Sequence, residues 1–134
     1  MTADRPKALI CGMLEREGKA LFLKRKLPDG EAIEMPSVFG ILSADPVSQL
    51  AEGFRKQTGI KADVGQVVLE SRHDFEGVHI PCLVFRMTPL HEGGIEPEPA
   101  SVYTGFEWLA IEDARIRKHA PKGRWLSEPI MRVD

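Results

Sequence analysis

The chain has 134 residues, of which 43% are hydrophobic and 28% are charged, and its formal net charge is −2. This length and composition predict one globular domain, residues 1–134, with a substantial hydrophobic core. The small net charge gives no electrostatic basis for binding nucleic acid or an anionic membrane, so neither partner is expected.

Targeting signals and cysteine usage bear on the cellular compartment of the protein. The first residues lack the layout of a signal peptide, and no apolar run is long enough to span a bilayer, so we expect a cytoplasmic protein. Cys11 and Cys82 each lie in a strand-like run without the spacing of a metal or redox motif. Both are expected to be small buried apolar side chains.

The first third of the chain predicts strands joined by turns. Residues 7–15 and 20–26 alternate or run apolar, and a Glu-Gly-Lys turn separates them, which favours a hairpin. Leu21 and Leu23 should face inward, with Phe22 on the opposite face. The Pro-Asp-Gly sequence at 28–30 is a strong turn signal before the segment 32–42.

A capped helix is predicted over residues 45–59. Asp45 is a good N-cap, Pro46 suits the first helical position, and Gly59 suits the left-handed position after the last turn. Five residues recur at helical spacing and should form one buried stripe. They are Val47, Leu50, Ala51, Phe54 and Thr58.

The second half of the chain predicts two long strands, at 62–73 and 78–87, with Pro81 marking an edge or a bulge. A polar loop at 91–99 follows, then a short strand at 105–110 that contains Trp108 as a core residue. A second helix is expected from 111 to about 118. Residues 119–134 show no clear period.

Residues 36–60 resemble the box of the Nudix (MutT-like) hydrolases, whose pattern is G-x5-E-x7-R-E-U-x-E-E-x-G-U with U a bulky aliphatic residue. Gly59 matches the pattern's last glycine, and Phe54 and Ile60 match two U positions. Glu34 and Pro36 match the W-E-L-P-G-G string that precedes the box, and FEWLAIEDA resembles a late family signature. The resemblance implies an α/β/α sandwich with a mixed, largely antiparallel sheet between two helices.

The chemical positions of the box depart from the family. Magnesium takes carboxylate oxygens, and the family presents them at i, i+3 and i+4 on the helix. A lysine in that place would repel a divalent ion. We therefore predict no metal or other cofactor in this degenerate box. The departing residues are Val38 for glycine, Ala44 for glutamate, Glu52 for arginine, and Gly53, Lys56 and Gln57 for glutamates.

Candidate site residues follow from the resemblance. Arg25 matches a basic position near the phosphates, and we take Arg25, Glu34, Lys56 and Gln57 as candidate ligand-binding residues. Three of them have a structural alternative: Arg25 as a solvated strand end, and Lys56 and Gln57 as residues of an exposed helix face. Lys56 would then pair with Glu52 at i, i+4. The four histidines show no ligand spacing and receive no role.

Three functions stay open on the sequence. The first is a domain that binds a nucleotide or related phosphorylated ligand without magnesium-dependent hydrolysis, with Lys56 and Arg25 supplying positive charge. The second is an active pyrophosphohydrolase of nucleoside diphosphate derivatives, whose magnesium would be held by Glu34 and Glu70 outside the box. The third is a non-catalytic interaction module, such as a homodimer. The residues favour the first or third, and the sequence identifies no particular ligand.

Overall fold

The computed structural model describes residues 6–41, 45–91 and 96–133. It contains nine strands, two α-helices and one 3-10 helix among these residues, and the predicted α/β class is confirmed. The strands are β1 (Ala8–Met13), β2 (Glu15–Arg16), β3 (Lys19–Leu27), β4 (Gly30–Glu34), β5 (Ser37–Gly40), β6 (Ala62–Phe75), β7 (Val78–Pro89), β8 (Gly105–Leu109) and β9 (Met131–Arg132). The helices are α1 (Pro46–Thr58), α2 (Ile111–Arg115) and the 3-10 helix η1 (Pro121–Ser127).

The strands form two sheets rather than the single sheet that was predicted. One has the order β5-β1-β7-β6-β9, with β1 and β7 parallel and the other pairs antiparallel; in the second, β3 pairs with β2, β4 and β8. The predicted hairpin between residues 7–15 and 20–26 is therefore wrong in its partner. Both edges of β1 are already occupied by β5 and β7, so only its extension, β2, pairs with β3.

Helix α1 begins and ends where the capping residues predicted. The Asp45 Oδ1 accepts a hydrogen bond from Val47 N at 3.2 Å, and Gly59 has φ 76°. Leu50, Phe54 and Thr58 are buried as predicted, and Ala51 is partly buried. Val47 is 44% exposed, which corrects its place in the stripe: it lies in the first turn, at the rim of the core.

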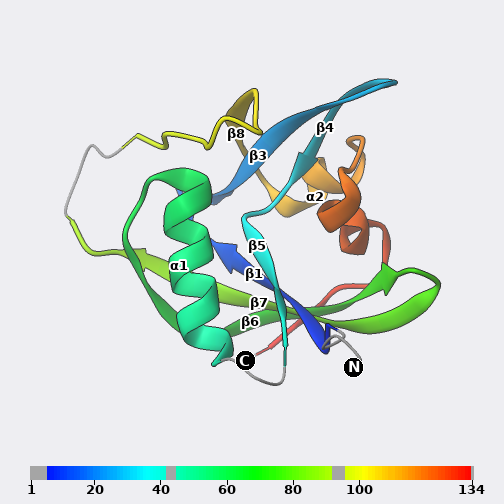
Figure 1. The fold of residues 1–134 in the computed structure, drawn as a ribbon, viewed down its shortest axis with the longest axis horizontal. Helices are drawn as coiled ribbons and strands as arrows, with labels where there is room; N and C mark the ends of the chain where they lie inside the picture. Colours follow the sequence, from blue (N-terminus) through cyan, green and yellow to red (C-terminus); the bar gives the residue numbers. More distant parts are fainter. Residues whose placement is uncertain (1–5, 42–44, 92–95, 134) are drawn as a thin grey trace, which may run out of the picture.

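Two hydrophobic clusters lie on opposite faces of the sheets. Leu50 and Phe54 of α1 pack with Ile10 and Leu21 in one cluster. The other holds Phe22 and Met35 with Ala114 of α2 and Trp125 of η1. Figure 1 shows α1 and α2 on opposite sides of β1 and β5, which confirms the α/β/α arrangement. The two cysteines are fully buried in the second cluster, as predicted, with their sulfurs 3.9 Å apart.

The C-terminal segment departs most from the predictions. The second helix ends at Arg115 instead of near residue 118, and the stretch without a clear period contains η1 and β9. Trp125 of η1 is completely buried, whereas Trp108 is only partly buried and carries the Arg16 guanidinium 4.5 Å above its ring. In the described part of the chain, no helix is long and apolar enough to cross a membrane.

Candidate functional site

The face of α1 that corresponds to the box carboxylates is packed against β5. A Cβ built on Gly53 would lie 2.2 Å from Val38 Cγ1, so the valine methyl fills the space above the glycine. One turn further on, Gln57 binds the backbone of Ser37 with both ends of its amide. Ser37 N donates to Gln57 Oε1 at 3.0 Å, and Gln57 Nε2 donates to Ser37 O at 2.8 Å. This face of α1 is therefore a helix–strand interface.

Lys56 lies beside this interface but points into solvent. Its ammonium pairs with Glu52 at 3.1 Å, and the two side chains are 65% and 62% exposed. The i, i+4 pair that the sequence predicted is confirmed. Such an exposed pair contributes about 0.3–0.5 kcal/mol to helix stability.

The residues on this face do not fit a divalent metal. Gly53 offers no side chain, Lys56 is a cation, and the oxygen of Gln57 is already bonded to Ser37. Across residues 6–41, 45–91 and 96–133, no group of three or more His, Cys, Asp or Glu side chains could hold a metal ion. Position 44, which corresponds to the first box glutamate and is Ala44 here, lies outside the described residues.

Glu34 lies at the centre of a buried polar cluster at the end of β4. Its Oε2 accepts a hydrogen bond from the Tyr103 hydroxyl at 3.1 Å and pairs with Lys122 Nζ at 3.4 Å. Lys122 Nζ also donates to Ser37 O at 2.9 Å. Glu34 is fully buried, and neither its Oε1 nor the Ser37 hydroxyl has a partner among the described residues. Burial and the negative charge of Glu34 raise the pKa of Tyr103.

The cluster depends on residues that the sequence did not single out. Lys122 reaches Glu34 because η1 docks on β4: Ala120 N donates to Ile33 O at 2.9 Å. A Cβ on Gly123 would lie 2.6 Å from that same Ile33 oxygen, so only a glycine permits this approach. No periodic signal marks η1, and Lys122 is one basic residue among several in the tail.

Arg25 lies on the same face of its sheet as Glu34. Leu23 of β3 pairs with Glu34 of β4, and paired residues of neighbouring strands share a face. Arg25 lies two residues after Leu23 on β3, so it shares that face. Arg25 is partly buried, and its positive charge opposes part of the rise in the pKa of Tyr103. Among the residues that the structure describes, no carboxylate pairs with its guanidinium.

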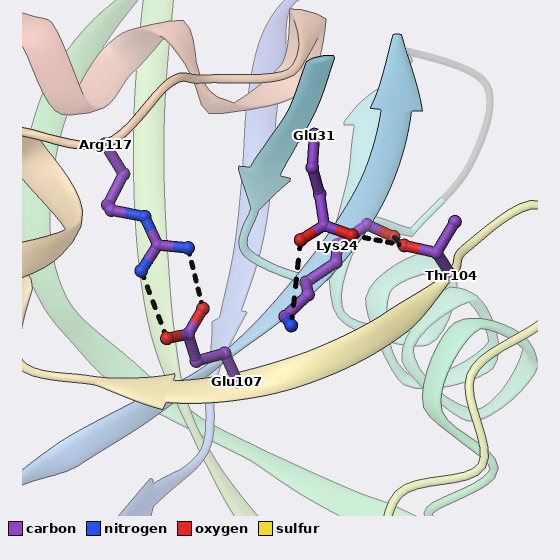
Figure 2. Close-up of polar contacts among 5 residues, drawn as sticks. All are labelled: Lys24, Glu31, Thr104, Glu107 and Arg117. Carbon is purple, nitrogen blue, oxygen red and sulfur yellow. Dashed lines mark hydrogen bonds and ion pairs between the residues drawn. The ribbon is translucent and has the colours of Figure 1, made fainter.

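The neighbouring charges on the opposite face of β3 are matched within the chain. Figure 2 shows Lys24 paired with Glu31 at 3.7 Å, and the Thr104 hydroxyl donating to Glu31 at 3.0 Å. It also shows the two-bond pairing of Arg117 with Glu107, at 3.1 and 2.8 Å. These bonds lower the pKa of the Glu107 carboxyl. Within the described residues, Arg25 differs from Lys24 and Arg117 in having no such partner.

Glu70 and Glu34 belong to different sheets. Glu70 belongs to β6, opposite Leu83 of β7 and Met131 of β9, in the other sheet. It lines a surface depression that also contains Arg72 and His79. The two carboxylates proposed to hold metal in an active enzyme therefore come from different sheets.

Two of the histidines, His119 and His73, contact residues of the fold. His119 contacts Ser127 Oγ at 3.1 Å and the carbonyl oxygen of Ala114 at 2.9 Å. His73 is buried beside Phe39, with ring centroids 5.9 Å apart, and burial lowers its pKa.

No family model and no curated protein sequence matches the chain. Solved structures do. The E. coli ORF135 protein is 20% identical over 90% of this chain and 85% of its own, with a TM-score of 0.68. The MutT Nudix hydrolase of Burkholderia pseudomallei is 17% identical over 81% and 86%, with a TM-score of 0.59. An ADP-ribose pyrophosphatase of Streptococcus suis is 16% identical over 92% and 87%, with a TM-score of 0.62.

At these identities the likeness establishes the fold. The chain has the fold of the Nudix hydrolases, as its box-like segment predicted. Function has to be argued from the site, because one fold hosts many activities.

Proposed function

We propose that this chain is a Nudix-fold domain that binds a nucleotide or related phosphorylated ligand and does not hydrolyse it with magnesium. The observation that carries the proposal is the joint between α1 and β5. Val38 fills the space above Gly53, and Gln57 binds the Ser37 backbone, where Nudix chemistry needs carboxylates.

Without these carboxylates the chain lacks the ligands for the metal that accelerates pyrophosphate hydrolysis. In a magnesium-dependent phosphoryl reaction the metal neutralises charge on the phosphates and activates water, which is worth several kcal/mol of transition-state stabilisation. Each 1.36 kcal/mol corresponds to about a tenfold change in rate. A face without carboxylates therefore supports turnover lower by several powers of ten.

Arg25 supports the choice of an anionic ligand. A partly buried cation without a counter-ion among the described residues is an expensive arrangement, and a bound anion relieves that cost. The guanidinium matches the geometry of phosphate oxygens. Lys56 and Gln57 already have partners in the chain, and Glu34 is fully buried, so the proposal places first contact at Arg25.

Calorimetry and thermal unfolding with ADP, ADP-ribose and inorganic pyrophosphate test the proposal, each with magnesium and with a chelator. A ligand at ten times its Kd stabilises by about 1.4 kcal/mol, or about 5 °C for a domain of this size. We expect this shift in both conditions. Arg25→Gln should abolish it, whereas Lys26→Gln, an exposed neighbour on the other face of β3, should retain it.

Three outcomes would contradict the proposal. Magnesium-dependent hydrolysis that Glu34→Gln or Glu70→Gln abolishes would establish the pyrophosphohydrolase instead. A shift that needs magnesium would show that a metal site exists despite the residues on α1. No shift with any ligand, together with a dimer by sedimentation, would favour an interaction module.

A further inference from the structure

A cavity lies on the face of the molecule that α2 covers, away from α1. Its volume is about 330 Å³, which is the lower end of the range for small-molecule sites. Buried side chains of Met13 and Leu69 line it, together with the partly buried Val68 and Ile111. These four residues also belong to, or pack against, the hydrophobic cluster under α2, so the cavity opens onto the core.

An irregularity in β6 shapes this cavity. The pairing of β6 with β7 shifts register between Val67 and Leu69, which leaves Val68 outside the ladder. The carbonyl oxygen of Val68 instead accepts a hydrogen bond from Val133 N at 3.0 Å, just beyond β9. Residues 131–133 are thereby held beside the cavity, and Arg132 becomes part of its lining.

Four charged side chains line the same cavity. Arg86 lies opposite Met13 on β7, and Arg132 lies on β9; Glu15 comes from β2 and Glu112 from α2. No ion pair or hydrogen bond to any of the four side chains is present within the described ranges. Two positive and two negative groups therefore line one cavity without a direct ion pair among them.

We propose that this cavity binds a small zwitterion of the amino-acid type with an apolar side chain. The carboxylate of the ligand meets Arg86 and Arg132, and its ammonium meets Glu15 and Glu112. Its side chain lies on Met13, Val68 and Ile111. The charges of the two arginines and the two glutamates sum to zero, so a ligand with one positive and one negative group can pair with all four. A purely anionic ligand would instead place its negative charge beside the two glutamates. This inference does not depend on the proposed nucleotide site.

Calorimetric titration of the purified chain with leucine, methionine and phenylalanine tests the proposal. The decisive comparison is leucine against its decarboxylated and deaminated analogues, 3-methylbutylamine and 4-methylpentanoate. Each analogue loses charge-assisted hydrogen bonds worth about 1.5–3 kcal/mol, so we expect at least about tenfold weaker binding for both.

Variants assign each charge to its part of the ligand. Arg132→Gln should weaken leucine at least about tenfold and reduce the preference for leucine over 3-methylbutylamine, because Arg86 alone then meets the carboxylate. Glu112→Gln should reduce the preference for leucine over 4-methylpentanoate, because Glu15 alone then meets the ammonium. Both side chains are exposed, so the fold should be retained, which circular dichroism checks. Arg72→Gln, an exposed arginine outside this cavity, is the matched control and should leave binding unchanged.

The proposal is overturned if none of the three amino acids binds, if 4-methylpentanoate binds as tightly as leucine, or if Arg132→Gln and Glu112→Gln behave like Arg72→Gln. None of these results alters the test at Arg25, so the two proposals fail independently.

Discussion

The contact between Val38 and Gly53 can be tested by a substitution whose effect should change sign with its background. Gly53→Ala places a Cβ 2.2 Å from Val38 Cγ1, far inside the distance of real contacts. Overpacking of this kind destabilises by about 2–3 kcal/mol. The better helix propensity of alanine returns about 1 kcal/mol. We therefore expect Gly53→Ala to lower the free energy of unfolding by about 1–2 kcal/mol.

Val38→Ala removes the obstructing methyl and leaves the Val38 Cβ, which lies 3.7 Å from the position that the new Cβ at residue 53 would take and is in ordinary contact with it. In that background only the propensity term remains, so Gly53→Ala should stabilise by about 0.5–1 kcal/mol. The double-mutant cycle should give a coupling energy of about 1.5–3 kcal/mol.

Urea unfolding of the four proteins, followed by circular dichroism, measures these differences, with equal m-values as the check on two-state behaviour. An unchanged effect of Gly53→Ala in the two backgrounds would refute the reasoning, because it would mean that Val38 does not fill the space above Gly53.

Three further predictions concern the core and the buried cluster. Phe54→Ala should destabilise by about 3–5 kcal/mol in urea unfolding, whereas Arg55→Ala, exposed on the same helix, should change stability by less than about 0.5 kcal/mol. Lys122→Met keeps the aliphatic stem but removes the ion-pair partner of a buried carboxylate, and should cost about 2–4 kcal/mol at neutral pH. Lys118→Met, whose partner Asp29 is exposed, is the matched control and should cost much less. Burial lowers the pKa of His73 below its ordinary 6.5, so the unfolded chain binds the proton more readily. Stability should therefore fall as the pH drops below about 6.5, and His73→Gln should reduce that slope.

The sequence predicted most of α1 because its signals are local. Asp45, Pro46 and Gly59 act on their own backbone or on the next turn, so no tertiary partner is needed to place the helix ends. The pairing of strands is less local. The run at 7–15 reads as one strand, but it splits between two sheets because β1 has neighbours on both edges.

The contacts around the candidate site residues could not be predicted, because they too join distant parts of the chain. Glu34 was singled out by its motif, but the residues that contact it, Tyr103 and Lys122, are 69 and 88 positions away in the chain (34 to 103 and 34 to 122). Gln57 was singled out because it stands where the box has a glutamate, yet its partner is the backbone of Ser37, which no side-chain pattern encodes. The contact of Val38 with Gly53 joins two departures from the box that look unrelated when the sequence is read in order.

The contact between Val38 and Gly53 affects which substitutions could build a metal site on α1. Gly53→Glu, Lys56→Glu and Gln57→Glu together place carboxylates at i, i+3 and i+4, the arrangement that suits magnesium. With Val38 in place, however, the new glutamate at 53 meets Cγ1. A glutamate at 57 also loses the amide that donates to Ser37 O, which sets a carboxylate against a carbonyl.

We therefore expect the triple variant to be destabilised and to bind no Mn²⁺ by calorimetry. Adding Val38→Gly should allow weak binding of one ion, because it removes the obstructing side chain and lets the strand backbone move away from the helix. The two variants carry the same three carboxylates, so the difference between them isolates the steric term. Equal Mn²⁺ binding by both would mean that the packing of α1 on β5 does not limit metal binding at this face.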